Sequence, residues 1–167
     1  MLTFLLCIIK HTHSWVALHR RRLAVADDKK LKVIIFEHDQ TILNRFKGLF
    51  NFKGHDVLSY SEPDTCPLLT DMQCDCPKDS PCADVLIADM QMGKMSGLEF
   101  FEHQRKKGCK TPDGNKLLLG EEITAEQQRA IKNLGCGFIK KPFNAYDVAN
   151  WVERRATIIY EGSPTMH

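Results

Sequence analysis

From residue 31 onward, short apolar runs alternate with amphipathic segments, and this alternation constrains the fold more than any other feature. The strand-like runs are LKVIIF (31–36), HDVLSYS (55–61), ADVLIAD (83–89), KLLLG (116–120) and CGFIKKPF (136–143). Most of the segments that follow them carry apolar residues at helical spacing. Strands that alternate with helices are typical of a parallel sheet with right-handed crossovers. The sequence therefore predicts an α/β fold with a doubly wound, five-stranded parallel sheet.

Capping residues mark the expected helix ends. Thr124 and Gln127 have capping-box spacing, and Asn144 stands before the last helical segment. Gly54 and Gly135 follow helical patterns and are expected stops.

The length of 167 residues suits one domain with a full-sized core, which we place at 31–158. Residues 1–30 are then an N-terminal extension and residues 159–167 a tail. A net charge of +2, without a helix-turn-helix or zinc-finger pattern, gives no reason to expect a nucleic-acid partner.

The extension opens with the apolar stretch MLTFLLCII, which is too short for a membrane span of about 20 residues. The basic stretch behind it is either an amphipathic segment for a membrane face or partner helix, or a poorly ordered extension. The seven cysteines, an odd number, come without an export signal, so we expect a cytoplasmic protein in a reducing compartment.

Charged residues stand where several expected strands end. Glu37 and His38 follow the first strand, Asp89 ends the third, Gly120 the fourth, and Lys141 comes at the end of the fifth. Functional residues of doubly wound sheets collect at the carboxyl ends of strands, so the acids and the lysine are expected in one shallow pocket. The plain structural alternatives are that Asp89 merely ends a strand and that Lys141 is a solvated surface lysine.

Four features in this order resemble the receiver domain of two-component response regulators, the CheY-like superfamily. They are VIIFEHD, LIADMQMGKMSGLEF, KLLLG and FIKKPF, and the likeness extends from about Leu31 to Arg155. The resemblance implies a flavodoxin-like sheet with strand order 2-1-3-4-5. It also implies that Asp89 accepts a phosphoryl group from the phosphohistidine of a partner kinase or phosphotransfer protein.

The same resemblance implies a Mg²⁺ ion and a counter-ion beside Asp89. Glu37 would lie on the metal side, the backbone carbonyl of Gln91 would be a further ligand, and Lys141 would pair with the phosphoryl oxygens. An acyl phosphate concentrates negative charge, which a hard cation and an ammonium group neutralise. The Lys141–Pro142 peptide bond would be cis.

The chain departs from the family pattern at several of these positions. His38 replaces a second acid, and imidazole suits Zn²⁺ or Cu²⁺ better than Mg²⁺, which weakens the magnesium site. Asp39 would substitute only if the loop shifted register. Gly120 replaces a switch residue with a hydroxyl group and Gly93 replaces a loop proline, whereas Phe138 matches the usual aromatic switch residue.

A cysteine-rich insertion, residues 63–82, takes the place of the family's second helix. Its prolines leave room for about one helical turn, near LLTDM. The insertion contains Cys66, Cys74, Cys76 and Cys82. These cysteines are interpreted as a Zn²⁺ or iron–sulfur site, a disulfide, or free thiols packed as small apolar groups.

Two functional hypotheses share this fold. One is a stand-alone receiver, phosphorylated on Asp89, that signals by protein contact; the other is a pseudo-receiver that binds partners without phosphorylation. A homodimer is an option for either, and a cysteine-based metal or redox sensor is compatible with both. The stretch FEHDQT also resembles the D-x-D-x-T loop of haloacid-dehalogenase phosphatases, but Glu37 is one methylene longer than that nucleophile. We therefore expect a signalling domain that is not an enzyme.

Overall fold

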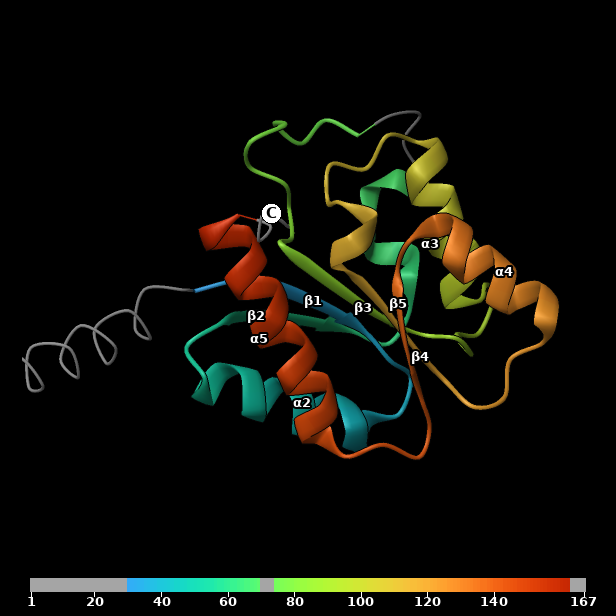
Figure 1. Ribbon diagram of the computed structural model, residues 1–167, viewed down its shortest axis with the longest axis horizontal. Coiled ribbons are helices and arrows are strands. Elements are labelled where there is room, and N and C mark those ends of the chain that lie inside the picture. Colours follow the sequence, from blue (N-terminus) through green and yellow to red (C-terminus); the bar gives the residue numbers. More distant parts are fainter. Residues whose placement is uncertain (1–29, 70–73, 163–167) are drawn as a thin grey trace, which may run out of the picture. The chain divides into compact units, whose positions relative to one another are not determined.

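The computed structural model describes residues 30–69 and 74–162, and within them the chain forms a five-stranded parallel sheet (Figure 1). The strands are β1 (Lys32–Phe36), β2 (Asp56–Tyr60), β3 (Val85–Asp89), β4 (Lys116–Gly120) and β5 (Gly137–Lys140). All neighbouring strands are parallel, and their order is β2-β1-β3-β4-β5. The predicted fold class and strand order are confirmed.

Helices cover both faces of the sheet, two on each side (Figure 1). They are α2 (Gln40–Phe52), α3 (Gly97–Lys106), α4 (Ala125–Leu134) and α5 (Ala145–Glu161). Side chains of α2 and α5 pack in one core cluster, and those of α3 and α4 pack in the other. Helix α5 continues beyond residue 158, where we placed the end of the domain.

The central strands explain why the apolar runs are continuous. Every residue of β3 and of β4 is buried, because both faces of these strands lie under helices. Lys116 is buried as well, and its Nζ donates to Asp113 Oδ1 at 2.8 Å and lies 5.6 Å from the centre of the Phe101 ring. The charge at the start of β4 is therefore paired.

The helix caps agree with the sequence signals. Thr124 and Gln127 form a capping box at the start of α4, and the side chain of Asn144 caps α5. Gly54 and Gly135 have φ angles of 87° and 75°, a left-handed conformation that glycine adopts without strain.

The connection between β2 and β3 has no α-helix in its described residues. Two short 3-10 turns, Pro63–Thr65 and Pro67–Leu69, take its place. Further along, Ser80 N donates to Pro77 O at 3.1 Å and closes a turn. The helical turn predicted near LLTDM is thus a 3-10 turn as far as residue 69, and its remainder lies outside the described residues.

The expectations for the N-terminal extension also lie outside the described residues, except at Lys30. Within the described part of the chain, no helix has the length and apolar character that a membrane crossing requires.

Candidate functional site

Three strands bring the predicted charged residues into contact at one edge of the sheet. Glu37 follows β1, Asp89 ends β3, and Lys141 follows β5. Lys141 Nζ donates to Asp89 Oδ2 at 2.7 Å and to Glu37 Oε2 at 3.1 Å. Glu37 is fully buried and Asp89 is 2 % exposed, so the ammonium group provides the partner that buried carboxylates require. We call Glu37, Asp89 and Lys141 the charged triad.

His38 lies at the mouth of the same site. Its Nδ1 is 3.3 Å from Glu37 Oε1 and 3.4 Å from Asp89 Oδ2, and its side chain is 56 % exposed. Ile42, Gln91 and Glu121 complete much of the wall of this shallow pocket. The imidazole therefore occupies the site itself and does not extend away from the two carboxylates.

Two members of the charged triad, Glu37 and Lys141, have shifted proton affinities. Burial raises the pKa of Glu37, as does the neighbouring Asp89 carboxylate, and these effects outweigh the Asp39 amide and Lys141, which lower it. Burial alone would lower the pKa of Lys141, but its hydrogen bonds to Asp89 and Glu37 raise that pKa above the ordinary value. Lys141 is accordingly a fixed positive charge at neutral pH.

Asp39 has a different role from the one considered from sequence. Its Oδ1 accepts hydrogen bonds from Ile42 N at 3.1 Å and Thr41 N at 2.7 Å, and so caps α2. These two amides lower the pKa of Asp39. Asp39 lines the pocket, but no register shift brings its carboxylate into the position of His38.

The residues after Asp89 orient its carboxylate. Gln91 N donates to Asp89 Oδ1 at 3.1 Å, so each Asp89 oxygen has one donor, Gln91 N or Lys141 Nζ. The predicted role of Gln91 concerned its carbonyl, which stays a prediction. The Lys141–Pro142 peptide bond is cis.

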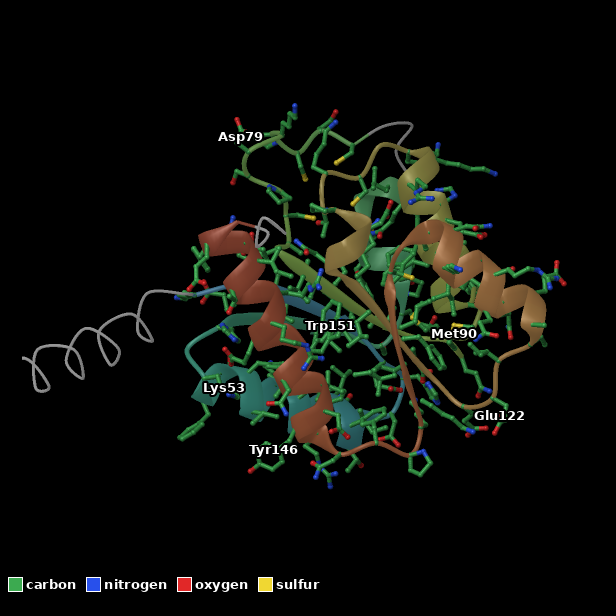
Figure 2. All side chains as sticks on the ribbon, in the orientation of Figure 1. Lys53, Asp79, Met90, Glu122, Tyr146 and Trp151 are labelled. Atoms are coloured by element: carbon green, nitrogen blue, oxygen red, sulfur yellow. The ribbon has the colours of Figure 1, made fainter. Side chains whose placement is uncertain are left out.

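Met90 occupies the space beside Gly120, where the sequence indicated only a missing hydroxyl group (Figure 2). A Cβ atom added to Gly120 would lie 2.6 Å from Met90 Cγ, 2.8 Å from Met90 Cβ and 3.4 Å from Phe138 Cε2. Met90 is 8 % exposed, so this packing is internal. A serine or threonine at 120 would require Met90 to move. Sequence reasoning missed Met90, although it directly follows Asp89.

Two glycines of the loop after Asp89 also fit their surroundings closely. A Cβ atom on Gly93 would lie 2.6 Å from Glu62 Oε1, so a proline ring is not accommodated without moving Glu62. A Cβ atom on Gly97 would overlap the backbone carbonyl oxygen of Asp89. The first turn of α3 can approach the end of β3 this closely only because residue 97 is glycine. Neither Glu62 nor Gly97 was singled out from sequence.

Three side chains of the pocket could together hold a divalent cation. Among the described residues, Glu37, His38 and Asp89 form the group whose potential ligand atoms all lie within 4.8 Å of one another. The two carboxylates fit the oxygen preference of Mg²⁺, which usually takes one or two protein carboxylates plus waters and substrate oxygens. His38 would provide a nitrogen ligand, whereas Mg²⁺ prefers oxygen ligands. The imidazole therefore favours a transition-metal ion over Mg²⁺.

The cysteines of the insertion are free thiols in the described residues. Cys74 is buried, Cys66 and Cys76 are half-buried, and Cys82 is exposed. Burial raises the pKa of Cys66, and partial desolvation together with the neighbouring Cys76 thiol raises the pKa of Cys82 to about 12. A disulfide between these four cysteines is not present.

Comparison with known proteins identifies the fold. A scan against protein-family models and a search of curated proteins found no match. A CheY-like receiver domain from Methanospirillum hungatei JF-1 is 17 % identical, with a TM-score of 0.63, over 80 % of this chain and 99 % of that chain. The receiver domain of Francisella response regulator 1452 is 19 % identical, with a TM-score of 0.62, over 78 % and 99 % of the two chains.

A third neighbour is similar to the same extent. The receiver domain protein from Clostridium thermocellum is 22 % identical, with a TM-score of 0.60, over 78 % of this chain and 97 % of that chain. The chain therefore has the fold of CheY-like response regulator receiver domains.

Proposed function

We propose that the protein is a signalling receiver that accepts a phosphoryl group on Asp89 and acts through protein–protein contacts. The observation that supports the proposal is the charged triad, in which the buried Asp89 carboxylate lies 2.7 Å from the ammonium group of Lys141. The donor would be a histidine kinase or a phosphotransfer protein. Receiver domains are signalling domains, and we propose no catalytic turnover for this chain.

The transfer step uses the oxygens of Asp89. One Asp89 oxygen attacks the phosphorus of a phosphohistidine, the phosphorus–nitrogen bond breaks, and the electron pair goes to the departing imidazole, which takes up a proton from solvent. Lys141 Nζ is placed to stabilise the added negative charge because it already contacts the acceptor carboxylate at 2.7 Å. A divalent cation held by Glu37, Asp89 and His38 would neutralise further phosphoryl charge when bound.

A second candidate function is supported by the packing of Met90 against Gly120. A hydroxyl group at the fourth strand end would contact the phosphoryl group, and here the space for that side chain is taken by a methionine. In this alternative the domain binds its partners constitutively, without a phosphorylation-dependent change at β4.

The experiment that separates the two is treatment with a small-molecule phosphodonor, in the presence of Mg²⁺ or Mn²⁺, followed by intact-protein mass spectrometry. A phosphorylated receiver gains the mass of one phosphoryl group, and Asp89→Asn abolishes the gain. Asp79→Asn is the matched control, because Asp79 lies on an exposed loop away from the pocket. No mass gain in the wild-type protein with either cation would refute phosphorylation and support the constitutive module.

A further inference from the structure

Five cysteines from three chain segments converge beside the β2–β3 connection, and we call them the thiol cluster. Its members are Cys66, Cys74, Cys76, Cys82 and Cys109. Cys66 and Cys109 pack against the same apolar core cluster. Electrostatic interactions link Cys66 to Cys74 and Cys109, and Cys82 to Cys66, Cys76 and Cys109. Figure 2 shows sulfur atoms gathered below the loop that carries Asp79.

Cys109 is the member that sequence reasoning left out of this group. It follows α3, far along the chain from the insertion, and only the fold brings it to the others. Cys66, Cys82 and Cys109 each interact electrostatically with both of the other two, and Cys82 interacts with Cys76 as well. The cluster thus joins the insertion to the end of a helix.

Hydrogen bonds other than thiol–thiol contacts hold the three segments together. Cys74 N donates to Lys107 O at 3.2 Å, which fixes the insertion against the end of α3. Thr111 Oγ1 donates to Ala83 O at 2.7 Å, which fixes the residues after Cys82 against those after Cys109. The convergence of the cysteines is therefore built into the backbone arrangement.

Gln104 supplies an independent polar contact to the cluster. Its side chain is almost completely buried, at 2 % exposure, and its Nε2 donates to Cys66 Sγ at 3.6 Å. Its Oε1 is buried and has no hydrogen-bond partner among the described residues. A buried amide that donates to sulfur is the kind of outer contact that stabilises a thiolate ligand. An apolar side chain would be expected here if the thiols served only as packing groups.

We propose that the thiol cluster binds one Zn²⁺ ion through four thiolates, of which Cys66, Cys82 and Cys109 are three and Cys74 or Cys76 is the fourth. Soft sulfur ligands select zinc over magnesium or calcium, and four-thiolate zinc sites are structural and tetrahedral. Each ligand releases its S–H proton to solvent on binding, so no oxidant or reductant is needed. The C-x-C and C-x₅-C spacings of the insertion differ from those of common iron–sulfur motifs.

Zinc binding would draw the thiols closer together. No three sulfur atoms of the described residues lie within 4.8 Å of one another. The described residues of the segment from Cys74 to Cys82 contain no helix or strand, so this segment can close around an ion while α3 keeps its position. The ion would then fasten the β2–β3 connection, which lacks an α-helix in its described residues, to the end of α3.

The test measures zinc in the purified, reduced full-length protein by elemental analysis after loading with Zn²⁺ and removal of excess metal. We expect about one zinc ion per chain in the wild type. The variants Cys66→Ser, Cys82→Ser and Cys109→Ser should lose it, whereas Cys136→Ser should keep it. Cys136 is the control because its electrostatic neighbours are Asp113, Lys116 and Arg105 and include no cysteine.

Cobalt loading keeps the proposal testable if a variant fails to fold. Co²⁺ in the wild-type protein should give the intense visible bands of a tetrahedral thiolate site, and Zn²⁺ should displace it. Comparison of Cys74→Ser with Cys76→Ser then identifies the fourth ligand. Absence of zinc in the loaded wild type, iron in its place, or full retention of zinc in Cys66→Ser would overturn the proposal.

Discussion

Replacing His38 by aspartate should turn the pocket into a better magnesium site. The Nδ1 atom of histidine and the Oδ atoms of aspartate are all bonded to Cγ, so they lie at the same distance from the backbone. A carboxylate oxygen of the new side chain can therefore lie where His38 Nδ1 now lies. That position is 3.3 Å from Glu37 Oε1 and 3.4 Å from Asp89 Oδ2. The substitution therefore adds a charged oxygen ligand without extending the side chain.

The size of the effect follows from one added ligand contact. We treat the added contact as equivalent to a hydrogen bond to a charged group, which contributes about 1.5–3 kcal/mol. The variant should therefore bind Mg²⁺ roughly 10–150-fold more tightly than the wild type, since about 1.4 kcal/mol corresponds to a factor of ten in affinity. The third carboxylate also repels Glu37 and Asp89 in the metal-free protein, so the variant should be less stable without Mg²⁺ and gain more stability on binding it.

Isothermal titration calorimetry with Mg²⁺ at neutral pH measures this directly. His38→Asn is the matched control, because it places a neutral oxygen at the same point, and Asn51→Asp adds the same charge at the exposed far end of α2. Both controls should bind Mg²⁺ much more weakly than His38→Asp. A dissociation constant for His38→Asp within about twofold of the wild-type value would refute the assignment of His38 to the cation site.

Two further predictions concern stability. Gly120→Ala should lower the free energy of unfolding by about 1–3 kcal/mol, because the added Cβ overlaps Met90. Gly48→Ala, which has no atom near the added Cβ, should raise the free energy of unfolding by about 0.5–1 kcal/mol. Urea denaturation of the two variants tests these opposite signs. Burial lowers the pKa of His55 below 6.5, so the unfolded chain binds the proton first and stability falls as pH drops through that value. His55→Gln should show a smaller loss between about pH 7 and pH 5, and an equal loss would contradict this.

The strands and the charged triad were within reach of sequence reasoning for the same physical reason. Strands buried on both faces are continuous apolar runs, and the carboxyl ends of parallel strands meet at one edge of a sheet. Glu37, Asp89 and Lys141 could therefore be placed together from their positions alone. No side-chain geometry had to be known for that step.

Other parts of the site depend on contacts that periodicity does not encode. Met90 fills the space at Gly120 because β3 and β4 are neighbours and its side chain turns toward that glycine. The capping role of Asp39, which directly precedes α2, had a sequence signal, since aspartate directly before a helix is a common N-cap. Cys109 had no such signal, because its approach to the insertion depends on where α3 ends.

The absent side chain of Gly97 determines how a change at Asp89 reaches the rest of the molecule. The backbone of Gly97, where α3 begins, packs directly against the backbone of Asp89. Two backbone segments in contact have no side-chain rotamers that could change to absorb a displacement. A shift of the Asp89 backbone therefore moves α3 as a rigid body. Amide chemical shifts along Gly97–Lys106 would register events in the pocket even with Met90 fixed against Gly120.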